Sequence, residues 1–211
     1  MKRHVGEKIA DKRIPLWLKL MYTGWIAVWA PSYAFADGWQ NFLWICDIAN
    51  FVLLVAFWTE SSLLFSSQLT GTLVIDLLWC VDLLVTLATG IHIIGGTEYM
   101  FDASISLPFR MLSLFHVMTP LLTVYGVFRL GYDRRGLMFQ MMLALLVFLL
   151  SILVTDPERN INFAFEMSLK LPLELNLWAN RLLLMIAYPL VICLPTHLLA
   201  LRYLPSSQRR G

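Results

Sequence analysis

Six stretches of this chain are almost entirely apolar, and each is about as long as a bilayer is thick. A membrane-spanning helix needs about 20 consecutive, mostly apolar residues. Continuous apolar runs such as 141–154 lack the alternation of polar and apolar residues that a barrel strand shows. The sequence therefore predicts an all-α integral membrane bundle that forms a single domain over residues 1–211. The predicted spans are 14–36, 39–58, 71–94, 106–130, 137–154 and 178–203.

Composition agrees with this fold class. Hydrophobic residues make up 59% of the 211 residues and charged residues only 14%, against about 45–50% and 25% in soluble domains. No long basic run with interleaved aromatic residues suggests nucleic-acid binding. The three cysteines lie in apolar runs without CxxC spacing, which argues against a disulfide framework or a cysteine-rich zinc site.

The distribution of lysine and arginine predicts the orientation of the bundle, because cytoplasmic loops carry an excess of these residues. Most basic residues fall on one side of the predicted spans: Lys2, Arg3, Lys8, Lys12, Arg13, Arg129, Arg134, Arg135, Arg202, Arg209 and Arg210. The other side is acidic, with Asp37, Glu98, Asp102, Asp156, Glu158, Glu166 and Glu174. We therefore expect a bacterial-type inner (plasma) membrane protein with both termini in the cytoplasm.

Two segments allow more than one interpretation. The basic start, the apolar stretch and Ala34-Phe35-Ala36 resemble a cleavable signal peptide. We favour a retained first helix, because the stretch is long, rich in tryptophan and contains Lys19. The serine-rich segment 59–70 is either an extension of a helix or an interfacial segment.

Ionisable residues inside the predicted spans mark the place where the protein acts. An ionised group near the bilayer centre costs about 2.5–3.5 kcal/mol on insertion scales, so a chain rarely keeps one without a use. At about 1.5 Å per residue, three of these groups reach a similar depth of about 12–16 Å from the ends of their spans. These three are Asp47, Asp82 and His116, while Asp76 and His197 are expected nearer the cytoplasm.

Three kinds of chemistry fit these groups. In an acid–base site, His116 is the general base, Asp47 and Asp82 orient it, and Cys46, Ser113 or Thr119 attacks. In a metal site, one zinc or iron ion is held by carboxylates and imidazoles; the candidate ligands are Asp47, Asp82, His116 and His197. In a proton or ion path, the same acids and histidines carry the charge. The structural alternative is that these groups only bond helices together.

Four further residues are candidates for binding a substrate. Arg110 and Arg181 lie near the outer ends of their predicted helices, where they either snorkel to the interface or bind an anionic headgroup or carboxylate. Ser113 lies on the same stripe of its helix as His116, and Asn50 lies one turn after Asp47.

Parts of two predicted spans resemble the androgen-induced protein family, six-span hydrolases of fatty-acid esters of hydroxy fatty acids. The residues that carry the resemblance are Trp39, Phe42, Leu43, Asp47, His116 and Pro120. The resemblance implies that His116 is the base. The family's nucleophilic threonine corresponds to Trp44, which cannot attack an ester, so Cys46 or a bound water would replace it. Uncharacterised bacterial multi-pass membrane proteins also resemble this chain, at residues 112–116, 129–135 and 195–197.

The function expected from the sequence is an intramembrane enzyme that hydrolyses or transfers an acyl or related group on a lipid. The alternative is a non-catalytic membrane subunit or small transporter, whose buried polar groups bind a cofactor, a proton or a partner helix. The expected partners are membrane lipids, with a homo-oligomer or a larger membrane complex as further possibilities.

Overall fold

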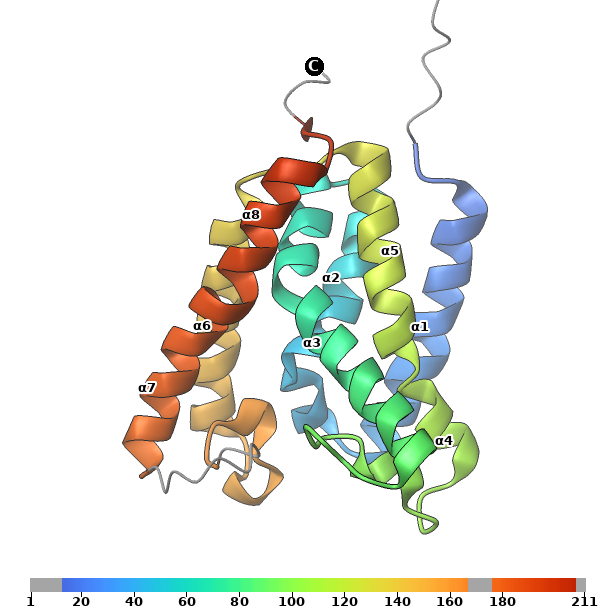
Figure 1. Ribbon diagram of the computed structural model, residues 1–211. Coiled ribbons are helices and arrows are strands. Elements are labelled where there is room, and N and C mark those ends of the chain that lie inside the picture. The colour runs from blue at the N-terminus through green and yellow to red at the C-terminus, as the bar shows by residue number, and fades with distance from the viewer. Residues whose placement is uncertain (1–12, 167–175, 208–211) are drawn as a thin grey trace, which may run out of the picture.

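The computed structural model describes residues 13–166 and 176–207 (Figure 1). These residues are predominantly helical and contain no β-strand. The α-helices are α1 Leu16–Ala36, α2 Ile45–Thr59, α3 Ser62–Thr89, α4 Leu107–Leu112, α5 Phe115–Leu130, α6 Gly136–Val154, α7 Leu177–Ala187 and α8 Leu194–Tyr203. The short 3-10 helices are η1 Trp39–Leu43, η2 Glu98–Phe101, η3 Pro157–Arg159 and η4 Ile161–Phe163, and η5 Tyr188–Cys193 is a π-helical segment.

Four helical segments are long and apolar enough to cross a membrane: α3, α4–α5, α6 and α7–η5–α8. The expected all-helical class with membrane-length helices is thereby confirmed. Helix α1 has 21 residues, but Lys19, Pro31 and its tryptophans and tyrosines make it less apolar, and α2 has only 15 residues. Six crossings therefore remain a prediction.

The helices form a bundle around α3, which packs against α2, α5 and α6 and against η5 and α8 (Figure 1). The first and last described residues lie at the same end of this bundle. We call it the terminal end, and it comprises residues 13–16, 59–62, 130–136 and 203–207. The opposite end, which we call the loop end, comprises residues 36–44, 90–107, 154–166 and 176.

Helix α3 begins nine residues before the predicted span 71–94. The side chain of Ser61 caps it by accepting a hydrogen bond from the Leu64 amide at 3.3 Å, and Gly90 ends it with a φ of 73°. Residues 65–72 are all buried, so this part of α3 is surrounded by its neighbours. The serine-rich segment is therefore mostly the first part of a long helix.

Two other predicted spans are interrupted. The predicted helix 106–130 is divided into α4 and α5 at Ser113 and Leu114. The predicted helix 178–203 contains the π-helical segment with Pro189. Proline has no amide hydrogen and clashes with the preceding turn, which favours a wider turn at this point.

The core between α1, η1, α2 and α5 is aromatic. Trp29 is fully buried, and its ring centroid lies 5.1–5.7 Å from those of Tyr33, Phe42, Phe51 and Phe115. Tilted and edge-to-face contacts of this kind stabilise aromatic pairs. This cluster attaches α1 and η1 to the rest of the bundle.

Glycines allow α3 to approach α5 and α6 closely. A Cβ atom at Gly126 would lie 2.2 Å from the ring of Phe65, and one at Gly71 would lie 2.1 Å from the side chain of Gln140. Phe65 is fully buried and cannot move away easily. Close packing at small residues stabilises helix pairs in membranes, where no hydrophobic effect drives association.

The loop between α5 and α6 is attached to the C-terminal segment at the terminal end. The Tyr132 amide donates to the Pro205 carbonyl at 2.5 Å, and the Ser207 amide donates to the Tyr132 carbonyl at 3.0 Å. Asp133 is buried, and its carboxylate accepts three hydrogen bonds from the Arg135 guanidinium at 2.7–3.2 Å. These hydrogen bonds and the charge of Arg135 lower the pKa of Asp133 below its ordinary value.

We expect Gly126→Ala to destabilise the protein by about 1–3 kcal/mol, because the methyl group overpacks the contact with Phe65. Thermal unfolding in detergent measures the effect. Gly24→Ala is the matched control, since a Cβ at Gly24 meets nothing within 4 Å. Equal unfolding temperatures for the two variants would contradict the packing described here.

We expect Asp133→Asn to lower the unfolding temperature at pH 7 and to have little effect at pH 3. The pKa of Asp133 is lower in the folded state, so the charged carboxylate stabilises the fold above about pH 4. This contribution is lost as the pH falls through the folded-state pKa. Arg134→Gln is the control, because Arg134 is near Asp133 but makes no hydrogen bond to its carboxylate, unlike Arg135. A pH-independent difference between Asp133→Asn and the unaltered protein would argue against this account.

Candidate functional site

The centre of the site is a buried histidine–aspartate pair that joins α5 to α3. His116 lies in the first turn of α5, and its Nδ1 is 2.8 Å from Oδ1 of Asp76 in the middle of α3. The ring of Trp79, one turn after Asp76, stacks on the imidazole with a centroid distance of 4.6 Å and an interplanar angle of 24°. The imidazole is therefore held in one position by a carboxylate at its edge and an indole on its face.

The other two polar atoms of this pair have no hydrogen-bond partner among the described residues. Nε2 of His116 makes no hydrogen bond to any residue in 13–166 or 176–207, and 9% of the side chain is exposed. Oδ2 of Asp76 is buried and also has no partner in the described chain, because the nearby Thr72 hydroxyl donates to the Gln68 carbonyl instead. An aspartate that accepts the Nδ1 proton leaves the Nε2 lone pair available, which is the arrangement of a general base.

The structure places Asp82 away from His116, at the loop end. Its Oδ1 accepts hydrogen bonds from three successive backbone amides, and its Oδ2 accepts one from the Thr97 hydroxyl. The amides belong to Ile93, Ile94 and Gly95, at 2.7–3.3 Å. Asp82 therefore holds the loop that follows α3.

The predicted depth of Asp82 was counted from residue 71, the start of the predicted span, whereas the helix begins earlier. With the helix beginning at Ser62, Asp76 lies about 21 Å along it and Asp82 about 30 Å. Asp76 therefore lies at the middle of the helix, although its sequence position suggested the cytoplasmic half. The signal that was missed is the N-cap at Ser61, which marks the start of α3. Trp79, one turn beyond Asp76, was also not identified from the sequence.

Asp47, Asn50 and Cys46 lie together in the first turns of α2. Asp47 is buried and accepts a hydrogen bond from the Asn41 amide group at 3.0 Å. Asn50 donates to the Cys46 carbonyl at 3.3 Å and accepts from the Tyr22 hydroxyl at 3.1 Å, so its side chain is occupied. Cys46 is only half-buried. Helix α2 packs against α3 and α5, the two helices that carry the histidine pair.

Hydroxyl groups extend the polar cluster from His116 toward the loop end. Ser113, one turn before His116, shares a hydrogen bond of 2.7 Å with the Tyr33 hydroxyl. The Tyr99 hydroxyl interacts with the side chains of Ser113 and Trp79, and burial raises its pKa above the ordinary value. Neither tyrosine was identified as part of the site from the sequence, because each lies on an element far away in the chain.

The remaining candidates lie elsewhere and hold other parts of the fold. Arg110 donates to the Met100 carbonyl at 2.6 Å. Arg181 donates to the Ala164 carbonyl at 3.0 Å and lies over the rings of Phe165 and Trp178. His197 is paired with the Tyr132 hydroxyl at 2.7 Å, near the terminal end.

The four candidate metal ligands do not come together. Asp82 binds the loop after α3, His197 binds Tyr132, and His116 binds Asp76. Within residues 13–166 and 176–207, no three histidine, cysteine, aspartate or glutamate side chains are placed to hold a metal ion. The geometry offers a histidine–aspartate pair, and no step below involves a metal.

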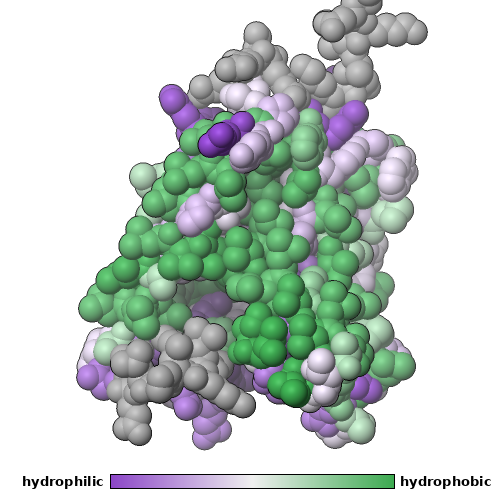
Figure 2. All heavy atoms as spheres, viewed as in Figure 1, coloured by the Kyte–Doolittle hydropathy of each residue, from purple (hydrophilic) through white to green (hydrophobic). Residues whose placement is uncertain are grey.

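The surface around the bundle is apolar over most of its height, as Figure 2 shows, with hydrophilic residues at the two ends. In the half nearer the loop end this surface is hollowed, and hydrophilic side chains are visible at the bottom of the hollow. Figure 1 shows α3 diverging from α6 and α7 in this region. In agreement, only Trp79, Asp82 and Thr86 are buried in the part of α3 after residue 76.

Comparison with known proteins does not assign this chain to a family. No family model, curated protein or solved structure matches it. The resemblance of residues 39–47 and 116–120 to the androgen-induced protein family therefore stays a prediction.

Proposed function

We propose that this protein is an intramembrane enzyme that hydrolyses or transfers an acyl or related group on a lipid, with His116 as the general base. The observation that carries the proposal is the buried pair of His116 and Asp76, in which Nδ1 is bonded and Nε2 is free. Intramembrane ionisable groups are expensive, and helix association alone recovers little of that cost.

In this mechanism His116 first accepts a proton and then donates the same proton. Asp76 holds the proton on Nδ1, so Nε2 accepts the proton of the attacking hydroxyl or thiol as the new bond to the acyl carbon forms. The same proton then passes to the leaving oxygen when the ester bond breaks. A bound water, Cys46 and Ser113 are the candidate nucleophiles. If Cys46 or Ser113 attacks, an acyl-enzyme forms; a water or an acceptor hydroxyl then gives its proton to Nε2 and takes the acyl group, and Nε2 returns that proton to the released side chain. The stacked ring of Trp79 keeps Nε2 directed toward the reaction and stabilises the imidazole position.

A lipid substrate suits the apolar surface of this bundle. The hollow in Figure 2 opens sideways into the apolar surface, where acyl chains would lie. Its hydrophilic floor suits the polar linkage of a lipid ester. Entry from the side brings the substrate in without crossing the loops at either end.

The orientation we propose has six crossings, with both termini in the cytoplasm of a bacterial-type inner membrane. The shared position of the first and last described residues supports an even number of crossings (Figure 1). The basic residues of the described chain are concentrated at the terminal end, including Arg129, Arg134, Arg135 and Arg202, as the positive-inside rule requires of a cytoplasmic side. Helices α1 and η1–α2 then supply the first two crossings.

The second candidate is a non-catalytic membrane subunit or small transporter. A buried network favours it: Gln68 donates to Gln140 at 3.3 Å, Gln140 to the Tyr188 hydroxyl at 2.8 Å, and Tyr188 to the Gly71 carbonyl at 3.3 Å. This network joins α3, α6 and η5; Gln68 and Gln140 are fully buried, and Tyr188 is half-buried. His116 also lines neither of the two best-defined surface depressions.

We expect His116→Gln to reduce hydrolysis of a fluorogenic long-chain acyl ester by at least about 100-fold in mixed micelles, because the base is lost. His197→Gln is the matched control, since this histidine also has a hydrogen-bonded Nδ1 but lies near the terminal end. Unfolding temperatures show that both variants are folded. Full activity in a folded His116→Gln variant, or no ester hydrolysis by the unaltered protein, would favour the subunit.

Reporter fusions in a bacterial host test the six crossings. We expect alkaline phosphatase to be active after Asp37 and Ser104, and green fluorescent protein to fluoresce after Glu60 and Arg134. The fusions after Asp37 and Glu60 decide together, because only a chain that crosses at both α1 and α2 carries Asp37 outside and returns Glu60 to the cytoplasm. Phosphatase activity of the fusion after Glu60 would indicate fewer than six crossings.

A further inference from the structure

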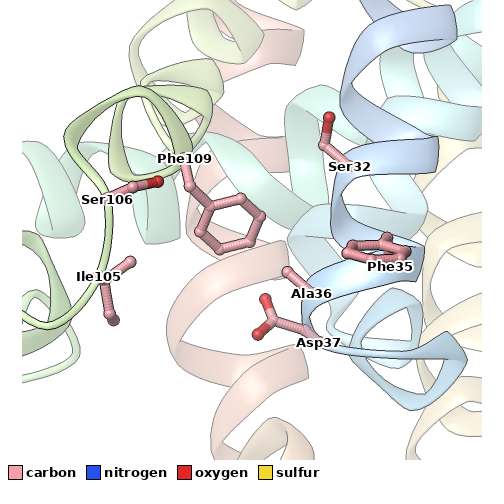
Figure 3. Close-up of a pocket in the computed structure, with 7 residues that line it drawn as sticks. All are labelled: Ser32, Phe35, Ala36, Asp37, Ile105, Ser106 and Phe109. Carbon is pink, nitrogen blue, oxygen red and sulfur yellow. The ribbon is translucent and has the colours of Figure 1, made fainter.

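A groove at the loop end separates the end of α1 from the start of α4 (Figure 3). Ser32, Phe35, Ala36 and Asp37 form one wall, and Ile105, Ser106 and Phe109 form the other. In Figure 3 the Asp37 carboxylate and the Ser106 hydroxyl both point toward the space between these walls. The groove thus combines one carboxylate, a hydroxyl and two aromatic rings.

The Asp37 carboxylate has no hydrogen-bond partner in the parts of the chain that the structure describes. Asp37 is half-buried, and burial raises the pKa of its carboxyl above the ordinary value, while nearby Arg159 opposes the rise. It follows directly after the last residue of α1. The carboxyl end of a helix carries a partial negative charge, so the helix adds to the attraction of this groove for a cation.

A positive group lies beside this negative one. The Arg159 guanidinium donates a hydrogen bond to the backbone carbonyl of Asp37 and is otherwise exposed. The carboxylate and the guanidinium thus offer two opposite charges next to each other at the edge of the groove. A ligand in which a short linker joins an ammonium to a phosphate matches both.

The position of the groove indicates where such a ligand comes from. Phe35 is 96% exposed and Trp39 is 59% exposed, and both lie next to Asp37 in the chain. Exposed aromatic residues at the end of an apolar helix are typical of the level of lipid headgroups. The exposed apolar surface of α1 continues from this level along the bundle, with Val28 and Met21.

We propose that this groove binds the headgroup of an amine-bearing zwitterionic phospholipid from the leaflet at the loop end. Asp37 binds the ammonium, Arg159 binds the phosphate, and the acyl chains lie along the exposed side of α1. The Ser106 hydroxyl accepts an N–H bond, and the ring of Phe109 lies over the cation. A primary ammonium supplies N–H donors that a trimethylated ammonium lacks, so phosphatidylethanolamine is preferred to phosphatidylcholine.

Native mass spectrometry of the full-length protein, released from detergent with added lipid, tests this site. We expect phosphatidylethanolamine to bind about tenfold more tightly than phosphatidylcholine or phosphatidylglycerol of the same chain length, which corresponds to one charge-assisted hydrogen bond. Asp37→Asn should remove this preference. Arg159→Gln should weaken binding of all three lipids, because each carries a phosphate.

Glu158→Gln is the matched control, because it removes one negative charge at the same end of the molecule, outside the groove. Unchanged unfolding temperatures show that the variants are folded. Equal binding of the three lipids by the unaltered protein would overturn the proposal. So would an undiminished preference in Asp37→Asn, or the same loss of preference in Glu158→Gln. These outcomes do not depend on the acyl-transfer chemistry at His116.

Discussion

The fold depends on the need to satisfy polar groups inside an apolar bundle, where water is not available to do so. Helix α3 carries many of these groups, and three of them bond to three different neighbours. Ser66 accepts from the Asp133 amide of the α5–α6 loop, and Gln68 bonds to Gln140 of α6. Asp76 bonds to His116 of α5. The polar residues of α3 therefore specify which element packs where along its length.

Incomplete satisfaction of polar groups on this helix supports the site that we propose. Asp82 receives four hydrogen bonds from the loop after α3, so its charge is fully compensated and its role is structural. Among the described residues, Asp76 is hydrogen-bonded only to His116, and its Oδ2 has no partner. Unpaired buried polar atoms are costly and occur preferentially at functional sites. The two acids have the same side chain, and their surroundings give them different tasks.

The sequence was sufficient for the helical membrane class, because length and continuous apolarity determine it. It also identified His116, Asp47 and Asp82 as unusual. It did not pair His116 with Asp76, because the depth of a residue is counted from the start of its helix and α3 begins at Ser62. The partners of Asp82 are backbone amides, which every residue has, so no pattern of side chains predicts them. Tyr33 and Tyr99 reach Ser113 only through the three-dimensional packing.

The length of α3 has a consequence for the membrane around it. Its 28 residues extend about 42 Å, whereas the hydrocarbon core of a bilayer is about 30 Å thick, so the helix must tilt or emerge from it. Tilting carries its second half away from α6 and α7, which is where the surface is hollowed (Figures 1 and 2). A thicker bilayer lessens the difference between the length of the helix and the thickness of the hydrocarbon core, and thus reduces the tilt. Bilayer thickness, which depends on lipid composition, therefore sets how far α3 tilts or emerges.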